Sequence, residues 1–310
     1  MIFLVMKEKR KHKNLVLITT RFHLNFAASL LVSIYKLKWI SVMLDSFVAY
    51  DKNYYQKMGS PFVLPFRALS FMESLSYKKS DVIFISSAYE ISELNNKVRT
   101  DLHAKIERTP LSTKMINCDS DTYAKSRSRI ISQLGLDVDT YIVTFHGNFK
   151  ENVPSLQAAR FLIETLSWKL YNINKKICIL LIGKGLEGYD LSRYKNIRYL
   201  GFVDNLCEYL SNTCLEVVPI VGGQGIKMKI LDAMALGKAV IASEDGERGF
   251  VEPNPIIVER MDKFAERINE LVTDKDKLAE IGKKSREYVI DYYSDTSMFR
   301  TVVESLVGSS

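Results

Sequence analysis

The chain has 310 residues, of which 47% are hydrophobic, 25% charged and 11% aromatic. This balance excludes a disordered chain, a collagen and a coiled coil, and the length favours two globular domains. The net charge is +7. The four cysteines form no C-x-x-C pair, and no run of about 18 uncharged apolar residues occurs, so we expect neither a disulfide framework nor a transmembrane helix.

The basic surplus lies in the first part of the chain. Residues 1–140 carry 21 Lys and Arg against 13 Asp and Glu, whereas residues 141–310 carry 22 against 23. A basic half suits anionic lipid headgroups or a phosphorylated substrate, and it is equally typical of a solvated face without a partner. Nucleic acid is not expected, because the basic residues are not interleaved with aromatics. These patterns predict a cytoplasmic protein whose basic half can meet the inner membrane surface.

The first part of the chain alternates between strand and helix patterns. Strands are predicted at 15–19, 40–44 and 82–86, and helices at 26–37, 64–77 and 88–94. Three or four strands are fewer than a complete doubly wound domain has, at about 30 residues per βαβ unit. We therefore predict that residues 1–140 form a Rossmann-like domain that lacks its opening β-α units.

From residue 141 onward the alternation is clearer. Predicted strands are 141–145, 177–182, 197–202, 215–220, 239–242 and 256–258, and predicted helices are 153–170, 186–194, 204–211, 226–236 and 261–273. Strands that alternate with helices indicate an α/β fold with a parallel sheet, so residues 141–285 are predicted to form a second Rossmann-like domain. Two further helices are predicted at 275–291 and 295–306, with Ser294 as the cap of the second.

The segment most informative about function runs from Pro219 to Ser243. Gly222, Gly223 and Gly225 predict a turn that allows close approach of a ligand, and the predicted helix after it points its free N–H groups at that turn. Lys227 and Lys229 lie where cations oppose the helix dipole, which a bound diphosphate would explain. The alternative is a simple tight turn with solvated lysines.

This segment resembles the signature of family-4 glycosyltransferases with the GT-B fold, whose pattern runs G-x-G-I-K-x-K-x-L-E-A-M-A-x-G-x-P-V-V. Here it is Gly223-Gln-Gly-Ile-Lys-Met-Lys-Ile-Leu-Asp-Ala-Met-Ala-Leu-Gly-Lys-Ala-Val-Ile. Further segments are similar in order and spacing, among them 144–154, 180–185, 200–204 and 247–250. The resemblance extends over about residues 15–306.

The resemblance implies two Rossmann-like domains that face each other across a cleft, with residues 286–310 as helices that cross back to the first domain. It also implies a nucleotide diphosphate sugar as donor and no cofactor or metal. The donor-binding residues that it indicates are Gly147, Asn148, Lys184, Gly223, Gln224, Gly225, Ile226, Lys227, Lys229, Asp232, Glu247 and Gly249. Arg21, His23 and Asp45 are candidate catalytic residues, because each lies near the end of a predicted strand; a structural role for His23 is the alternative.

The chain departs from the family pattern at three places. Gln224 and Asp232 stand where the family commonly has two acids eight residues apart, and Asn148 and Asn152 stand where many members have an Arg and a Lys. The chain also starts after the family's first strand and glycine-rich loop, which allows for a protein partner that completes the first domain.

The function implied is transfer of a sugar to a hydroxyl of a polysaccharide or glycolipid of the cell envelope, with retention at the anomeric carbon. The alternatives are an inactive or partner-dependent subunit that binds a nucleotide sugar, and a nucleotide-sugar epimerase.

Overall fold

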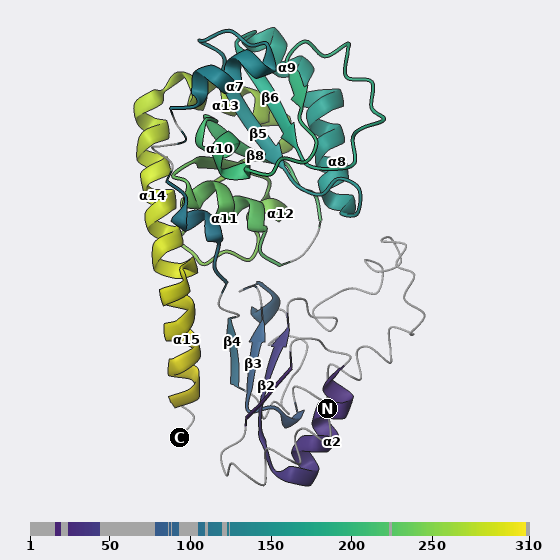
Figure 1. Ribbon diagram of the computed structural model, residues 1–310, viewed down its shortest axis with the longest axis vertical. Coiled ribbons are helices and arrows are strands. Elements are labelled where there is room, and N and C mark those ends of the chain that lie inside the picture. The colour runs from purple at the N-terminus through teal and green to yellow at the C-terminus, as the bar shows by residue number, and fades with distance from the viewer. Residues whose placement is uncertain are drawn as a thin grey trace. The chain divides into compact units, whose positions relative to one another are not determined.

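A computed structural model describes residues 16–19, 24–43, 78–85, 87, 89–92, 105–108, 111–119, 123, 125–222 and 225–307. The chain divides into two compact units, residues 1–111 together with 299–310, and residues 112–298. The boundaries predicted at 140/141 and 285/286 both fall inside the second unit. Parallel sheets with helices are present in both, so the predicted α/β class is confirmed (Figure 1).

The first unit contains a parallel sheet in the order β1-β2-β3-β4. Its described elements are β1 (Val16–Thr19), α2 (Asn25–Tyr35), β2 (Lys38–Met43), β3 (Val82–Ile85) and β4 (Lys105–Arg108). The predictions at 15–19, 26–37, 40–44 and 82–86 are confirmed. The fourth strand was not predicted, because Lys-Ile-Glu-Arg offers only one apolar residue to a strand pattern. The helix predicted at 64–77 lies outside the described residues, and residues 89–92 of the one predicted at 88–94 are helical.

Trp39 joins three parts of this sheet. Its side chain is completely buried, and its indole Nε1 donates a hydrogen bond to Thr19 Oγ1 in β1 at 3.0 Å. Its backbone N–H donates to Asp81 Oδ2, just before β3, at 2.7 Å. A buried indole needs an acceptor for its N–H, and Thr19 supplies it, so the middle strand is fixed to both neighbours.

The second unit contains a six-stranded parallel sheet in the order β10-β9-β8-β5-β6-β7. The strands are β5 (Tyr141–His146), β6 (Ile177–Ile182), β7 (Ile197–Tyr199), β8 (Leu215–Val218), β9 (Ala239–Ala242) and β10 (Ile257–Val258). All six strands predicted for this part are confirmed, although β7 and β8 end before residues 202 and 220. Every residue of β6, β8 and β9 is buried, as expected for a sheet that helices cover on both faces.

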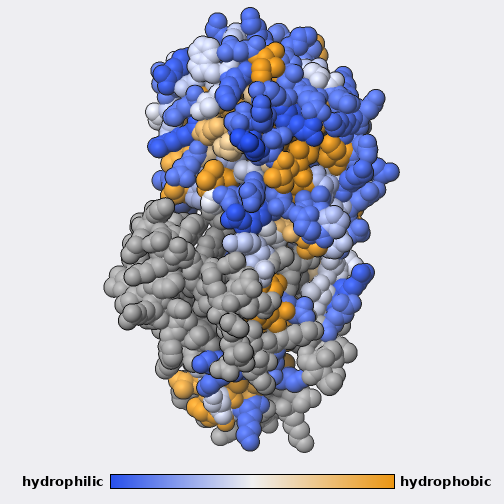
Figure 2. Space-filling model, turned by 180° about the vertical axis from the view of Figure 1, so that it is seen from behind, coloured by the Kyte–Doolittle hydropathy of each residue, from blue (hydrophilic) through white to orange (hydrophobic). Residues whose placement is uncertain are grey.

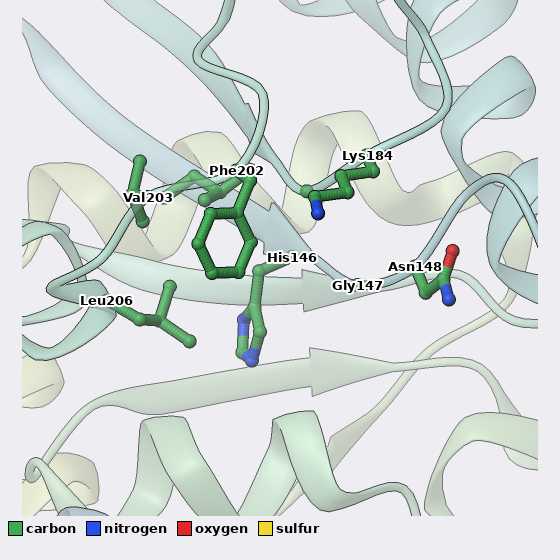
Figure 3. Close-up of a pocket in the computed structure, with 9 residues that line it drawn as sticks. His146, Gly147, Asn148, Lys184, Phe202, Val203 and Leu206 are labelled. Atoms are coloured by element: carbon green, nitrogen blue, oxygen red, sulfur yellow. The ribbon is translucent and has the colours of Figure 1, made fainter.

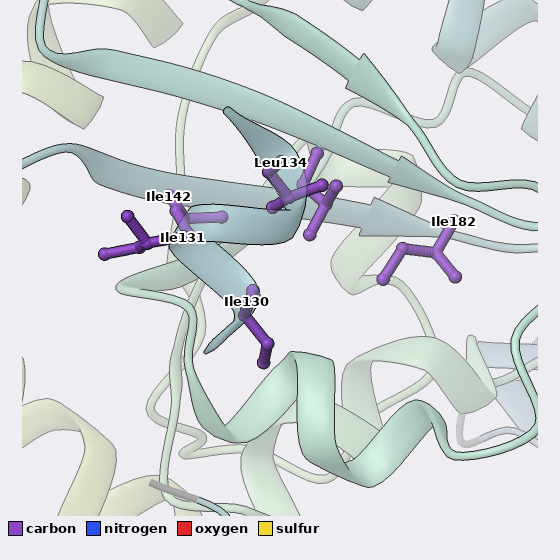
Figure 4. Close-up of a cluster of buried hydrophobic side chains, with 6 residues drawn as sticks. Ile130, Ile131, Leu134, Ile142 and Ile182 are labelled. Atoms are coloured by element: carbon purple, nitrogen blue, oxygen red, sulfur yellow. The ribbon is translucent and has the colours of Figure 1, made fainter. Parts of the chain in front are cut away.

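Helices α7 (Arg127–Leu134) and α10 (Leu206–Ser211) pack on one face of this sheet. Figure 4 shows the side chains of α7 against those of β5 and β6; the buried cluster consists of Ile130, Ile131, Leu134, Ile142, Leu180 and Ile182. Side chains alternate between the faces of a strand, so Ile179 and Leu181 point to the opposite face. There α9 (Ser167–Ile173) contacts β6 and packs with α13 (Phe264–Thr273).

The helix predicted over 153–170 is present as α8 (Val153–Phe161), a π-helical turn η3 (Leu162–Leu166) and α9. The helix predicted over 186–194 is wrong, because this segment consists of turns. Glu187 accepts the backbone N–H of Gly185, and Asp190 accepts that of Ser192 at 3.1 Å. Such local side-chain bonds compete with the helical ladder. Helix α7, in contrast, was not predicted.

The two terminal helices are confirmed as α14 (Lys275–Tyr293) and α15 (Asp295–Val307). Ser294 caps the second one as predicted, because its Oγ accepts the backbone N–H of Ser297 at 3.1 Å. Helix α14 approaches the turn after α11 (Met228–Ala235) so closely that a Cβ on Gly282 would lie 2.1 Å from the carbonyl oxygen of Gly237. Only a glycine at position 282 permits this approach.

The surface of the second unit in the view of Figure 2 is largely hydrophilic, with separate hydrophobic patches. Within the part of the chain that the structure describes, no helix combines the length and the hydropathy that a bilayer crossing requires.

Candidate functional site

The strand order of the second unit defines where a ligand can enter. The chain runs from β5 through β6 to β7 on one side, and then returns so that β8 pairs with the other side of β5. In open α/β sheets the crevice at such a switch point, outside the carboxyl ends of the strands, is the usual ligand site. His146 is the last residue of β5 and Glu216 lies in β8, so both belong to this switch point.

Glu216, His146 and Asp232 form a buried charged row at this position. Glu216 Oε1 lies 2.9 Å from His146 Nδ1 and accepts the backbone N–H of His146 at 3.1 Å. On the other side of the ring, His146 Nε2 lies 3.6 Å from Asp232 Oδ2. Thr113 Oγ1 donates to the other oxygen of Asp232 at 2.6 Å. The Glu216 side chain is fully buried, whereas 20% of the Asp232 side chain is exposed.

The two carboxylates set the charge of His146. Burial alone would lower the pKa of His146, but the carboxylates of Glu216 and Asp232 outweigh burial and raise it to about 9. Burial raises the pKa of Glu216, and the imidazolium with its hydrogen bonds opposes that rise. At neutral pH the ring is therefore protonated and carries an N–H on each side.

A pocket of about 340 Å³ opens at the carboxyl ends of β5, β6 and β7. It is lined by His146, Gly147, Asn148, Ile182, Gly183, Lys184, Phe202, Val203 and Leu206. Figure 3 shows the rings of Phe202 and His146 in the middle, with Lys184 and Asn148 on one side and Val203 and Leu206 on the other. One end of the pocket is thus apolar and the other polar, which is the arrangement that fixes the orientation of a small ligand.

Lys184 and Phe202 lie together at the pocket. The Lys184 Nζ is 4.7 Å from the centre of the Phe202 ring, which is a cation–π contact. Phe202 is 64% exposed, so its ring presents apolar surface to a ligand.

The two asparagines that replace the family's cations have local structural roles. Asn148 Oδ1 accepts the backbone N–H groups of Lys150 and Glu151 at 3.1 Å each. Asn152 caps α8 by accepting the N–H of Ser155 at 2.9 Å. Positive charge near the pocket therefore comes from His146 and from lysines.

The glycine-rich turn leads into α11 as predicted. Gly222 and Gly225 have φ values of +72° and +63°, a region that glycine adopts without strain. Helix α11 starts at Met228, two residues later than predicted, so Lys227 is the N-cap residue and no side chain caps the helix. The N–H groups of the first turn thus lack a side-chain acceptor from the N-cap position, as an anion-binding helix end requires.

Lys227 and Lys229 project from this helix start into partly buried surroundings. Lys227 Nζ donates to the carbonyl oxygen of Gly225 at 3.0 Å. Lys229 Nζ donates to Ser155 Oγ at 2.9 Å and lies 4.3 Å from the centre of the Phe145 ring. Burial lowers the pKa of Lys229 to about 8, although Glu216 opposes this effect. A bound polyanion would relieve the unfavourable burial of this charge.

The short helix α12 (Glu244–Glu247) holds the glycine-rich turn from the other side. Asp245 Oδ2 accepts the N–H of Gly222 at 2.7 Å. Glu247 shares the amide of Asn254 with Glu252. Burial, followed by the hydrogen bond with Glu252, raises the pKa of Glu247 to about 7, so this carboxyl is partly protonated at neutral pH.

The structure brings the predicted donor residues together in three neighbouring groups along one sheet edge. Gly147, Asn148 and Lys184 line the pocket. Gly225, Ile226, Lys227, Lys229 and Asp232 belong to the turn and to α11, and Asp232 reaches the pocket through His146. Glu247 and Gly249 follow β9.

The remaining predicted site residues are Arg21, His23, Asp45, Gly223 and Gln224, and all five lie outside the described residues.

Sequence reasoning missed Thr113, His146, Phe202, Val203, Leu206 and Glu216. One signal was available, because Glu216 is the only charged residue in the apolar run Leu-Glu-Val-Val-Pro-Ile. A charge in a strand that is otherwise buried needs a partner.

The segment that contains this site matches a family model. Residues 140–274 match the model of the family described as Glycosyl transferases group 1. The match contains the pocket, the buried charged row and the glycine-rich turn. No curated protein sequence matches the chain.

Solved structures with similar folds are GT-B glycosyltransferases. Alr3699/HepE from Anabaena, in complex with UDP, has a TM-score of 0.72 and 15% identity over 98% of this chain and 82% of its own. Sucrose-phosphate synthase from Thermosynechococcus elongatus has a TM-score of 0.68 and 19% identity over 99% and 78%. A glycosyltransferase from Rickettsia africae has a TM-score of 0.63 and 13% identity over 93% and 81%. The chain has the GT-B fold.

Proposed function

We propose that this protein transfers a sugar from a nucleotide diphosphate sugar to a hydroxyl group of a polysaccharide or glycolipid acceptor. The observation that carries the proposal is the pocket at the β5 switch point, which has an apolar end and a cationic end. The uncapped start of α11 lies in the same segment, which matches the family model of Glycosyl transferases group 1. The structures of HepE with UDP and with UDP-glucose support a uridine nucleotide as the first donor to test.

The donor nucleotide fits this site in one orientation. The base packs on Phe202, Val203 and Leu206, which form the apolar end of the pocket. The ribose hydroxyls donate hydrogen bonds to Asp232, whose carboxylate is the exposed end of the buried charged row. The diphosphate lies against the start of α11, where backbone N–H groups and Lys227 supply positive charge.

The reaction breaks the bond between the anomeric carbon and the diphosphate oxygen and forms a bond to the acceptor oxygen, whose proton is released. Negative charge grows on the departing diphosphate, and fixed cations and helix N–H groups stabilise that charge most in the transition state. Lys184, Lys227 and Lys229 take this role in our proposal, which is therefore independent of a metal ion. Retention at the anomeric carbon is proposed from the resemblance alone.

We also propose that the enzyme works on the cytoplasmic side of the inner membrane. The support is the surplus of positive charge in residues 1–140, which favours contact with anionic lipids and with a lipid-linked acceptor.

A thermal-shift titration with UDP, GDP, ADP and CDP tests the donor site. A ligand at about 100 times its dissociation constant stabilises a protein by about 2.7 kcal/mol, so UDP should raise the melting temperature clearly. Lys227→Ala should weaken binding about tenfold, which is the loss of about 1.4 kcal/mol of ionic hydrogen bonding. Lys169→Ala, an exposed lysine on α9, is the matched control and should bind as the unsubstituted protein does.

Turnover of UDP-glucose distinguishes the proposed transfer from its alternatives. Release of UDP that increases with an added sugar or glycolipid acceptor supports transfer. An isomerised sugar formed without acceptor would indicate an epimerase. Binding without turnover would indicate a nucleotide-sugar-binding subunit. No shift with any nucleotide, from a protein that melts cooperatively, would overturn the donor site itself.

A further inference from the structure

The proposed function does not explain why a carboxylate lies beneath the site. Glu216 is completely buried in β8 and cannot touch a ligand in the pocket directly. Burying an ionised carboxylate costs several kcal/mol unless it is paired. Its Oε1 accepts two N–H groups, both from His146, so the hydrogen bonds of Glu216 act through that residue, while its charge also favours the protonated form of Lys229.

His146 connects Glu216 to the surface of the site. Its ring has a carboxylate on each side, at 2.9 Å for Glu216 and 3.6 Å for Asp232. A neutral imidazole carries a proton on only one nitrogen, whereas the imidazolium can donate in both directions. The row therefore consists of a carboxylate, a cation and a second carboxylate. Removal of Glu216 would change both the orientation and the charge of the His146 ring.

Asp232 is the end of the row that a ligand can reach. One of its oxygens accepts the Thr113 hydroxyl at 2.6 Å and the other faces His146. With both sides occupied, the carboxylate is held in one orientation while part of it stays exposed. A carboxylate fixed in this way binds a diol with less loss of side-chain entropy than a freely rotating one.

We propose that Glu216, acting through the ring of His146, is a positioning residue that holds Asp232 for the ribose hydroxyls of the donor nucleotide. This inference rests on the proposed function. The charged groups that act on the ring are Glu216 from β8 and Asp232 from α11. Lys229 from α11 acts on Glu216, and Lys184 shares the pocket.

The decisive experiment compares UDP with 2′,3′-dideoxy-UDP by isothermal titration calorimetry. Glu216→Gln keeps the shape of the side chain and removes its charge. We expect it to weaken UDP binding about tenfold, the scale of a lost ionic hydrogen bond, and dideoxy-UDP binding by less than twofold. Asp232→Asn should show the same contrast. The double variant should bind UDP no more weakly than Asp232→Asn alone, because both changes act on one contact.

The pH profile separates positioning from general damage to the fold. In the unsubstituted protein His146 stays protonated between pH 6 and 8. The titration of this ring therefore does not change UDP affinity in that range. In Glu216→Gln the ring loses a carboxylate and deprotonates within this range. The positive charge that faces Asp232 at 3.6 Å then disappears, and UDP affinity should fall as the pH rises.

A second measurement needs no change at Glu216. The ring of His146 can be followed by NMR, with His146→Gln to assign its signal among four histidines. It should titrate near pH 9 and at a lower pH in Asp232→Asn. A ring that titrates near 6.5 in the unsubstituted protein would overturn the inference.

Other results also separate the hypotheses. Equal losses of UDP and dideoxy-UDP binding in Glu216→Gln, or no loss of either, would contradict the positioning role and leave the donor site standing. No UDP binding by the unsubstituted protein would contradict the proposed function and the positioning role together.

Discussion

Strands β6 and β8 lie on either side of β5 and both are completely buried, yet they are built differently. Strand β6 consists of apolar side chains alone, whereas β8 contains Glu216. Burial of apolar surface stabilises the fold directly, while burial of a carboxylate is tolerated only because His146 pairs with it. Strand β6 thus stabilises the fold and β8 serves the site, yet both are buried. Burial alone therefore does not distinguish a structural strand from a functional one in this sheet.

The largest expected effect comes from breaking the pair in β8. Glu216→Leu leaves His146 with one carboxylate fewer and should lower the free energy of unfolding by about 3–5 kcal/mol. Glu216→Leu combined with His146→Leu should recover most of that loss, because no buried charge of the pair remains. Urea unfolding of the two variants checks this. A double variant as unstable as the single one would show that packing, and not charge, sets the cost.

The matching change in β6 is Leu180→Ala. Leu180 is completely buried in the cluster of Figure 4, and such truncations cost about 2–5 kcal/mol. We expect the folded variant to keep most of its UDP affinity, because Leu180 does not itself line the pocket, although its cluster shares Ile182 with it. Denaturant unfolding and calorimetry measure the two quantities. A large loss of UDP affinity in Leu180→Ala would contradict the assignment of a purely structural role to β6.

The pH dependence of stability sharpens the comparison further. The pKa of His146 is raised to about 9 in the folded state, against about 6.5 unfolded. Its stabilisation is complete below pH 6.5 and is lost as the pH rises toward 9, by up to about 3 kcal/mol. Lys229 acts in the opposite sense above pH 8, because its folded pKa of about 8 lies below the unfolded value. Stability should therefore decline from pH 6.5 to 8, change little between pH 8 and 9, where the two effects oppose each other, and rise above pH 9 until the unfolded pKa of Lys229 is reached.

The decline should be absent in His146→Gln. Chemical unfolding at a series of pH values measures it, and a decline that persists in this variant would assign it to another group.

The smallest expected effect concerns an exposed apolar residue. Phe202→Ala should change the free energy of unfolding by no more than about 0.5 kcal/mol, because the ring is 64% exposed. It should weaken UDP binding about tenfold through loss of one wall of the pocket. Ile34→Ala, at another exposed residue, is the control for both measurements. Unchanged UDP affinity in Phe202→Ala would show that the base does not pack on this ring.

The sequence predicted the second unit well because its elements have strong local signals. The β-branched runs at 177–182 and 239–242 are strands, and the glycines at 222–225 precede α11 as expected. The segment at 186–194 failed, because the side chains of Glu187 and Asp190 bind the backbone nearby and prevent a helix. Local pattern does not reveal such competition.

The buried charged row was the larger omission in the site. His146, Glu216 and Asp232 are separated by 70 and 16 positions in the chain and meet only because β8 pairs with β5. The sequence shows His146 and Glu216 as isolated polar residues, and it places Asp232 in the signature segment without indicating its two neighbours. Lys227 and Lys229 were predicted from the sequence because they follow a glycine-rich turn, and such a turn before a helix indicates an anion-binding site.

The contact between Gly282 and Gly237 has a consequence for how this chain can change over generations. Gly237 needs its positive φ of +69° to end α11, and Gly282 must lack a Cβ to let that turn approach α14. Any mutation at position 282 pushes the long helix off the turn, so neither position can drift while the other stays. Gly237 of the signature segment is thus required by the turn that ends α11, and Gly282, 45 residues later, by the helix that approaches this turn, so both glycines serve shape and not catalysis.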